Sequence, residues 1–169
     1  MNASQGEFFI SVDVETSGPS PGKHSLLAIG ACTVADPSQT FYIELKPVNL
    51  TADPQAQAIH GLSLAALLET GTDPQKAMES LAAWLDQVTP AGSCPVFVAF
   101  NAPFDWMFVC DYFHRYLGRN PFGHAALDIK SLFMGITRSP WSGTSLDEVS
   151  RVILDGQRIS HHALEDALI

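Results

Sequence analysis

Two carboxylates, Asp13 and Glu15, stand one residue apart in a run of mainly aromatic and β-branched residues at positions 8–15. Side chains two positions apart on a strand point to the same face, so both acids would share one side of it. Neighbouring negative charges on a strand cost stability unless a cation lies between them, and Mg²⁺ prefers oxygen ligands of this kind. The pair is therefore a candidate metal site, and a strand end that points into solvent is the alternative.

A second candidate is formed by Asn101 and Asp105, which follow the short apolar run 95–100. In open α/β sheets, the groups that bind ligands gather beyond strand ends, where a strand leads into a helix. Asp105 would lie in the first turn of that helix, where the helix dipole favours an acid in any case. The position fits both a ligand-binding carboxylate and an ordinary residue of a helix start.

The end of the chain combines a base with an acid. His162 and Asp166 are four residues apart and would share a face of a helix that begins near residue 160. His161 and Asp166 converge only if His161 lies in the loop before that helix. Helical spacing alone favours His162 as the partner of Asp166, in what could be a plain surface pair. It does not decide which histidine is catalytic.

The elements that must position these residues follow from periodicity and from turn signals. Strands are predicted over residues 8–15, 26–35, 40–45, 95–100 and 125–129. Helices are predicted over residues 74–88, 104–117 and about 146–154, with a last short one from about residue 160. Three strands with short connections predict an antiparallel meander, and the alternation that follows predicts a mixed five-stranded sheet flanked by helices. The expected fold class is α/β, with residues 1–169 in one domain.

The composition excludes several classes of protein. The 169 residues include 18 acidic and 9 basic ones, and the net charge of −9 argues against a broad surface for duplex DNA or an anionic membrane. No apolar stretch approaches the roughly 20 residues of a membrane-spanning helix, and no signal peptide is visible. The three scattered cysteines fit a reducing compartment, so we expect a cytoplasmic protein.

Three motifs occur in a characteristic order: Asp13-x-Glu15 near the end of the first strand, Asn101-x3-Asp105 after the fourth, and His161-x4-Asp166 at the last helix. This order resembles the DEDDh family of 3′–5′ exonucleases, which has a ribonuclease H-like fold and includes proofreading subunits of bacterial polymerases. Supporting matches are Val14-Glu15-Thr16-Ser17-Gly18, Ile59-His60-Gly61, Leu127-Asp128-Ile129 and Ser145-Leu146-Asp147. The resemblance covers nearly the whole chain.

The resemblance implies a role for each residue. The implied ligands of two divalent ions, Mg²⁺ or Mn²⁺, are Asp13, Glu15, Asp105 and Asp166. His161 is implied to be the general base that accepts a proton from the attacking water. Contacts to the terminal nucleotide are implied for Thr16, Gly18, His60, Asn101 and Phe104. The implied activity is metal-dependent hydrolysis from the 3′ end of single-stranded DNA or RNA, with release of nucleoside 5′-monophosphates. The implied protein partner is a second copy or a polymerase, and no membrane is involved.

Two departures from the family pattern leave alternatives open. Phe100 stands where many relatives carry histidine. The predicted final helix is so short that Asp166 would be loosely held unless a longer tail or a partner stabilises it. The alternative functions are a catalytically weak module that binds nucleic acid or a polymerase, and a hydrolase of small phosphodiesters.

Outside the motifs, a few residues are candidates for contacts to nucleic acid. Trp141 lies in a polar loop and is a candidate for stacking on a base. Basic candidates for phosphate contacts are Arg115, Arg119, Arg138, Arg151 and Arg158. Other aromatic residues recur at helical spacing and are predicted to belong to the core: Trp84, Trp106, Phe108, Tyr112 and Phe113.

Overall fold

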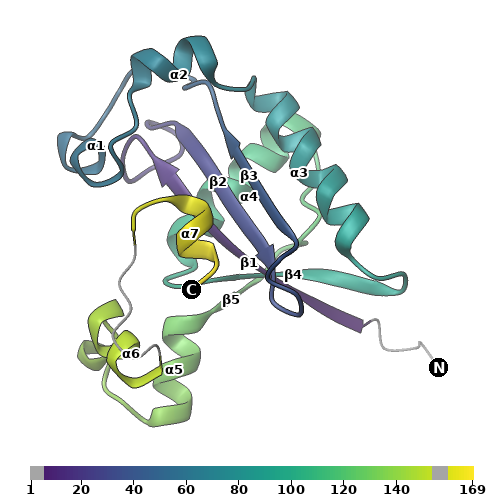
Figure 1. Cartoon of the computed structure of the whole chain (residues 1–169), viewed down its shortest axis with the longest axis vertical. Helices are drawn as coiled ribbons and strands as arrows, with labels where there is room; N and C mark the ends of the chain where they lie inside the picture. The colour runs from purple at the N-terminus through teal and green to yellow at the C-terminus, as the bar shows by residue number, and fades with distance from the viewer. Residues whose placement is uncertain (1–5, 154–159) are drawn as a thin grey trace.

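The computed structural model describes residues 6–153 and 160–169 and shows a five-stranded sheet flanked by helices (Figure 1). The strands are β1 (Gly6–Thr16), β2 (Leu26–Thr33), β3 (Thr40–Glu44), β4 (Ser93–Ala99) and β5 (Ala126–Asp128). Their order in the sheet is β3-β2-β1-β4-β5. The first three strands form the antiparallel meander, β4 is parallel to β1, and β5 is parallel to β4. The predicted α/β fold with a mixed sheet is confirmed.

The described helices are α1 (Pro54–His60), α2 (Leu64–Thr70), α3 (Pro74–Val88), α4 (Pro103–Leu117), α5 (Ile129–Thr137), the 3₁₀ helix η1 (Trp141–Gly143), α6 (Leu146–Ile153) and α7 (Ala163–Ala167). Four of them, α1, α2, α5 and η1, are not predicted from the sequence. α3 begins as predicted, because the Asp73 side chain accepts hydrogen bonds from the backbone N–H groups of Gln75 and Lys76. The unpredicted α1 and α2 are only seven residues long, and α5 follows β5 without a loop.

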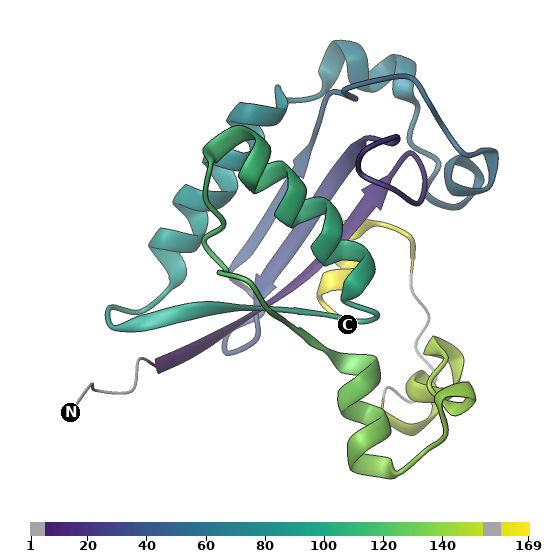
Figure 2. The same ribbon diagram turned by 180° about the vertical axis from the view of Figure 1, so that it is seen from behind.

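The two faces of the sheet carry different residues, because side chains alternate along each strand. In β1, Ile10, Val12 and Val14 belong to the core that α3 and α4 cover, whereas Asp13 and Glu15 point toward α7. Figures 1 and 2 show α4 and α7 on opposite sides of the sheet. The aromatic residues predicted for the core are confirmed: Phe108, Tyr112 and Phe113 are fully buried, and Trp84 and Trp106 are partly buried and pack against the core.

The C-terminal end of β1 has a free edge, and this edge positions the site. The pairing of β1 with β4 ends at Ser11 and Val98, whereas its pairing with β2 continues to Thr16. Beyond Ser11, the backbone N–H groups of β1 that point toward β4 therefore need other hydrogen-bond acceptors. Because α4 follows β4 after a short turn, its first side chains can reach this edge.

The last helix begins later than predicted. α7 starts at Ala163, because His161 takes a left-handed backbone conformation (φ 59°) and His162 an extended one (φ −124°). It is five residues long. Of the helix predicted over residues 146–154, α6 covers Leu146–Ile153, and residue 154 lies outside the described residues. Within the described ranges, no helix is both long enough and apolar enough to cross a lipid bilayer.

Candidate active site

Three carboxylates meet where β1 passes beneath α7. Asp13 and Glu15 project from β1 and Asp166 from α7, and one oxygen atom of each lies within 4.8 Å of the other two. The two acids of β1 share a face, as the alternation of side chains along a strand predicts. Oxygen atoms gathered at this spacing are the kind of ligand that hard divalent cations prefer.

The position of α7 is set by its contact with β2. Gly30 lies directly opposite Asp13 in the register of β1 and β2. A Cβ atom on Gly30 would lie 2.2 Å from the carbonyl carbon of Ala163, so the backbone of α7 rests directly on the strand. The thiol of Cys32 donates a hydrogen bond to the backbone carbonyl of Ala167 (3.2 Å). These contacts hold the third carboxylate over the other two.

The fourth predicted acid, Asp105, reaches the site from the opposite side of the sheet. It lies in the first turn of α4, is 4% exposed, and accepts a hydrogen bond at Oδ1 from the backbone N–H of Val14 (3.1 Å). Its side chain thus accepts a backbone hydrogen bond at the free edge of β1, where β4 no longer pairs with β1. Asp105 is outside the group within 4.8 Å, but it lines the same cavity as the other three carboxylates.

The cluster carries more negative charge than its surroundings balance. Burial, and then the charge of Asp166, raise the pKa of Asp13 to about 7. Burial, and then the charges of Asp13 and Asp166, raise the pKa of Glu15 to about 8. Burial, and then Asp13, hold the pKa of Asp105 well above its usual range. In the described part of the chain no lysine or arginine forms an ion pair with these acids, so the donor set fits a bound cation.

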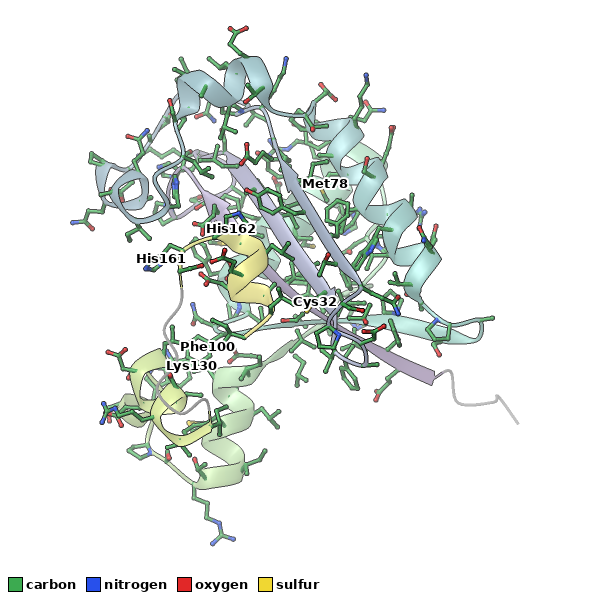
Figure 3. The ribbon with its side chains drawn as sticks, viewed as in Figure 1. Cys32, Met78, Phe100, Lys130, His161 and His162 are labelled. Carbon is green, nitrogen blue, oxygen red and sulfur yellow. The ribbon has the colours of Figure 1, made fainter. Side chains whose placement is uncertain are left out.

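The two histidines before α7 have different surroundings. The backbone N–H of His161 donates to Oδ2 of Asp166 (2.9 Å), the N–H of Ser160 donates to its Oδ1 (2.8 Å), and His161 is among the residues that line the cavity. The His162 ring instead stacks on Tyr42 of β3, with centroids 4.7 Å apart. Figure 3 labels both histidines at the turn into α7. The helical-spacing argument for His162 is wrong, because α7 begins after both histidines.

The cavity above the carboxylates has a volume of about 280 Å³. The predicted contact residues Asn101 and Phe104 line it, as does Phe100. Its remaining wall is largely apolar and includes Ile129 of α5, Leu146, Val149 and Ile153 of α6, and Ile169. The sequence offers no signal for this wall, since isolated apolar residues on separate helices have the pattern of ordinary core residues.

The other predicted contact residues lie beyond the end of β1. The Thr16 hydroxyl donates to the carbonyl of Gly18 (2.9 Å), and the His60 Nε2 atom lies 3.2 Å from the carbonyl of Thr16. His60 Nδ1 accepts the N–H of Leu62 (3.0 Å), so Nε2 carries the proton that Thr16 accepts. Burial lowers the pKa of His60, although the Thr16 hydrogen bond opposes this. These three residues form one linked group that does not line the cavity itself.

Asp128 connects α4 and α5, two of the helices that border the cavity. Its Oδ1 accepts the N–H of Ala102 (3.0 Å) at the start of α4, and its Oδ2 accepts the N–H of Ser131 (3.0 Å) in α5. Burial raises the pKa of Asp128, but the hydrogen bonds from Ser131 and Ala102 lower it by more. The net pKa is therefore below its usual value. The motif around residue 128 therefore contributes a structural link, which sequence spacing alone does not reveal.

Comparison with known proteins finds a matching family and a similar protein. The family model described as "Exonuclease" matches residues 10–169. The 3′–5′ DNA exonuclease Cap18 of Escherichia coli is 48% identical over 161 residues, which cover 95% of this chain and 86% of the relative.

Solved structures share the fold at low sequence identity. The nuclease domain of 3′hExo, a DEDDh family member bound to rAMP, superposes with a TM-score of 0.77 at 12% identity, covering 97% of this chain and 88% of that one. Escherichia coli exonuclease I, in a complex with single-stranded DNA, superposes with a TM-score of 0.72 at 16% identity, covering 96% of this chain and 38% of that one. The likeness extends across nearly all of the present fold.

Proposed function

The chain belongs to the exonuclease family, and on that premise we propose that it is a metal-dependent 3′–5′ exonuclease of single-stranded nucleic acid. The observation that carries the proposal is the cluster of Asp13, Glu15 and Asp166, with Asp105 bordering the same cavity. The family match over residues 10–169 also supports one exonuclease domain.

The four carboxylates are the proposed ligands of two divalent ions, Mg²⁺ or Mn²⁺. The raised pKa values of Asp13, Glu15 and Asp105 support this role, because burial and mutual repulsion make a bound cation favourable. Two such ions supply activation of the attacking water and stabilisation of the leaving 3′ oxygen. The chain itself holds the ligands on three elements: β1, α4 and α7.

His161 is the proposed general base. His161 is among the residues that line the cavity, and its backbone N–H donates to Asp166, so the turn that carries the imidazole is tied to the carboxylate cluster. The imidazole accepts a proton as water attacks the last phosphodiester. The bond from phosphorus to the 3′ oxygen of the preceding nucleotide breaks. The products are a nucleoside 5′-monophosphate and a strand with a new 3′ hydroxyl.

The terminal nucleotide is proposed to occupy the cavity beside Asn101 and Phe104. The apolar wall supports this placement, because a base loses contact with water there and ligand sites are usually lined in this way. Thr16, Gly18 and His60 are proposed to contact the nucleotide from the end of β1.

Single-stranded DNA is the substrate that we test first, because the relative at 48% identity is named a DNA exonuclease. RNA is the second substrate, since a structural neighbour is described as a 3′-exonuclease that recognises a histone mRNA stem-loop. The three free cysteines support a reducing, cytoplasmic location. A second copy of the chain or a polymerase is the proposed protein partner. Size-exclusion chromatography of the protein, alone and mixed with a polymerase, tests both.

The test uses DNA and RNA oligonucleotides labelled at the 5′ end, incubated with Mg²⁺ or Mn²⁺. We expect a ladder of successively shorter labelled products and free 5′-monophosphates. Asp13→Asn should reduce the rate by at least about a hundredfold, because it removes a ligand charge without changing the size of the side chain. The matched control is Glu69→Gln on α2, an exposed acid remote from the cluster, which should degrade the strand at the wild-type rate.

The products also separate this proposal from the alternatives. Internal fragments, or intact strands with either metal ion, would contradict it. Binding of oligonucleotides without degradation would support the catalytically weak module. Cleavage confined to dinucleotides would support a hydrolase of small phosphodiesters.

A further inference from the structure

Trp141 presents an aromatic ring to solvent beside the proposed active site. All three tryptophans lie in the described part of the chain; Trp84 and Trp106 pack against the core, but Trp141 is 56% exposed. Its backbone is fixed, because the buried Thr144 donates a hydrogen bond from Oγ1 to the Trp141 carbonyl (2.7 Å). An exposed ring on a fixed turn can bind a flat ligand with little loss of conformational entropy.

A lysine lies against this ring. The ammonium nitrogen of Lys130, the second residue of α5, is 4.3 Å from the centroid of the Trp141 ring. This cation–π contact lies at one face of the ring. Among the described residues, Lys130 has no carboxylate partner within ion-pair distance. The pair thus combines an apolar ring with an unbalanced positive charge.

The surrounding segment differs in charge from the rest of the chain. Residues 129–153 contain Lys130, Arg138 and Arg151 against Asp147 and Glu148, a net charge of +1 (3 − 2) in a chain of −9. Arg151 pairs with Glu148 at 2.7 Å. This segment, which contains α5 and α6, is therefore a part of the molecule where a polyanion meets little repulsion.

The Lys130–Trp141 pair lies close to the cavity in the chain. Ile129, which precedes Lys130, lines the cavity, and so does Leu146, five residues after Trp141. Figures 1 and 2 show α5 and α6 as a lobe that projects from the end of the sheet. Figure 3 labels Lys130 where this lobe joins the sheet.

We propose that Lys130 and Trp141 bind the part of the strand that remains attached, at least two nucleotides to the 5′ side of the bond being cut. A base stacks on the open part of the Trp141 ring, and the Lys130 ammonium contacts a neighbouring phosphate. This inference rests on the exonuclease function proposed above: the terminal nucleotide occupies the cavity, so a contact outside the cavity belongs to a nucleotide further along the strand.

The chemistry of the pair favours nucleic acid over a protein ligand. Every base has a face that stacks on an aromatic ring, and the phosphate backbone supplies the negative charge that Lys130 lacks in the described structure. Such contacts tolerate any base sequence. The pair should therefore strengthen binding of long strands regardless of sequence and have no effect on a dinucleotide.

The first experiment compares steady-state kinetics on a single strand of about twelve nucleotides and on a dinucleotide. Trp141→Ala should raise KM for the long strand roughly tenfold without changing kcat, and leave both parameters for the dinucleotide unchanged. Trp141→Phe, which keeps a ring, should recover most of the loss. The control is Ile136→Ala. Ile136 is 74% exposed on the same helix and points about 120° around the helix axis from Lys130.

The second experiment tests the charge and direct contact. Lys130→Gln should reduce the slope of log KM against log salt concentration by about 0.7, the value for one phosphate contact on a single strand. In the inactive Asp13→Asn protein, a long oligonucleotide should quench tryptophan fluorescence, and the additional change Trp141→Phe should remove that quenching.

The outcomes separate the two proposals. If Trp141→Ala raises KM equally for both substrates, or leaves KM and quenching unchanged, the strand-binding proposal is wrong, and the exposed ring is better explained as a contact for a protein. If the wild type cleaves neither substrate but the quenching depends on Trp141, the proposed catalytic function is wrong and the binding site stands.

Discussion

At the scale of single residues, the turn before α7 makes two adjacent histidines inequivalent. Asp166 accepts the backbone N–H groups of Ser160 and His161, so the carboxylate that belongs to the cluster also shapes the turn that presents His161. His162 faces the other way and stacks on Tyr42. A change at either histidine should therefore affect a different property of the protein.

We expect His161→Ala to lower kcat by about 10²–10⁴-fold, the usual contribution of a general base, with little change in thermal stability. His162→Ala should leave kcat within a few-fold of the wild type but lower the free energy of unfolding by about 1 kcal/mol, through loss of the ring stack. Single-turnover rates at saturating Mn²⁺ and thermal melts measure the two effects. A larger loss of kcat in His162→Ala would reverse the assignment of the base.

At the scale of elements, α7 depends on the surface beneath it. An isolated helix of five residues is unstable in water, so docking on β1 and β2 must hold it in place. The contact is closest at Gly30, where the strand has no side chain to separate the two backbones. The short final helix thus carries Asp166 because β2 offers a site without a Cβ atom.

Gly30→Ala should displace α7 and raise the concentration of Mn²⁺ needed for half-maximal activity by roughly tenfold or more, in the range found when the supports of metal ligands are removed. Hydrogen exchange should show weaker protection of residues 163–167. The control is Gly135→Ala in α5, where an added Cβ meets nothing within 4 Å and alanine favours the helix. Wild-type dependence on Mn²⁺ in Gly30→Ala would show that α7 tolerates the shift.

At the scale of the whole molecule, four of the 18 acidic residues line one cavity, where a bound cation can neutralise them. The cluster joins β1, α4 and α7, so its charge acts on the stability of the fold as well as on catalysis. Folding raises the pKa of Asp13 from 3.8 to about 7 and that of Glu15 from 4.5 to about 8. The folded protein therefore binds protons that the unfolded chain has released, and its metal-free form loses stability as the pH rises through this window.

In EDTA, we expect Tm to fall by roughly 5 °C or more between about pH 5.5 and pH 8.5, and Mn²⁺ to restore it most strongly at the higher pH. Asp13→Asn should show a smaller fall, because one of the repelling charges is gone. Glu69→Gln, an exposed acid outside the cluster, should behave like the wild type. A metal-free Tm that is independent of pH would contradict the raised pKa values.

Local signals predict much of the fold. Runs of aromatic, β-branched and other apolar residues, bounded by turn residues, predict the five strands, and the Asp73 cap and Gly118 predict the start of α3 and the end of α4. The missed helices have weak local signals: α1 and α2 are each seven residues long, and α5 shares Asp128 with the end of β5. The error at α7 has a local cause, since the left-handed conformation of His161 depends on its bond to Asp166.

The sequence by itself determined that Asp13 and Glu15 share one face, because the alternation of a strand is a local property. It also supplied the order of acids and histidine that resembles the exonuclease family. Only the tertiary structure decided that His161 borders the cavity, that Asp105 binds the backbone at the free edge of β1, and that α5 and α6 supply an apolar wall. These features depend on contacts such as Val14 with Asp105, 91 residues apart, and Cys32 with Ala167, 135 residues apart. Local spacing carries no information about such contacts, because packing of the whole chain creates them.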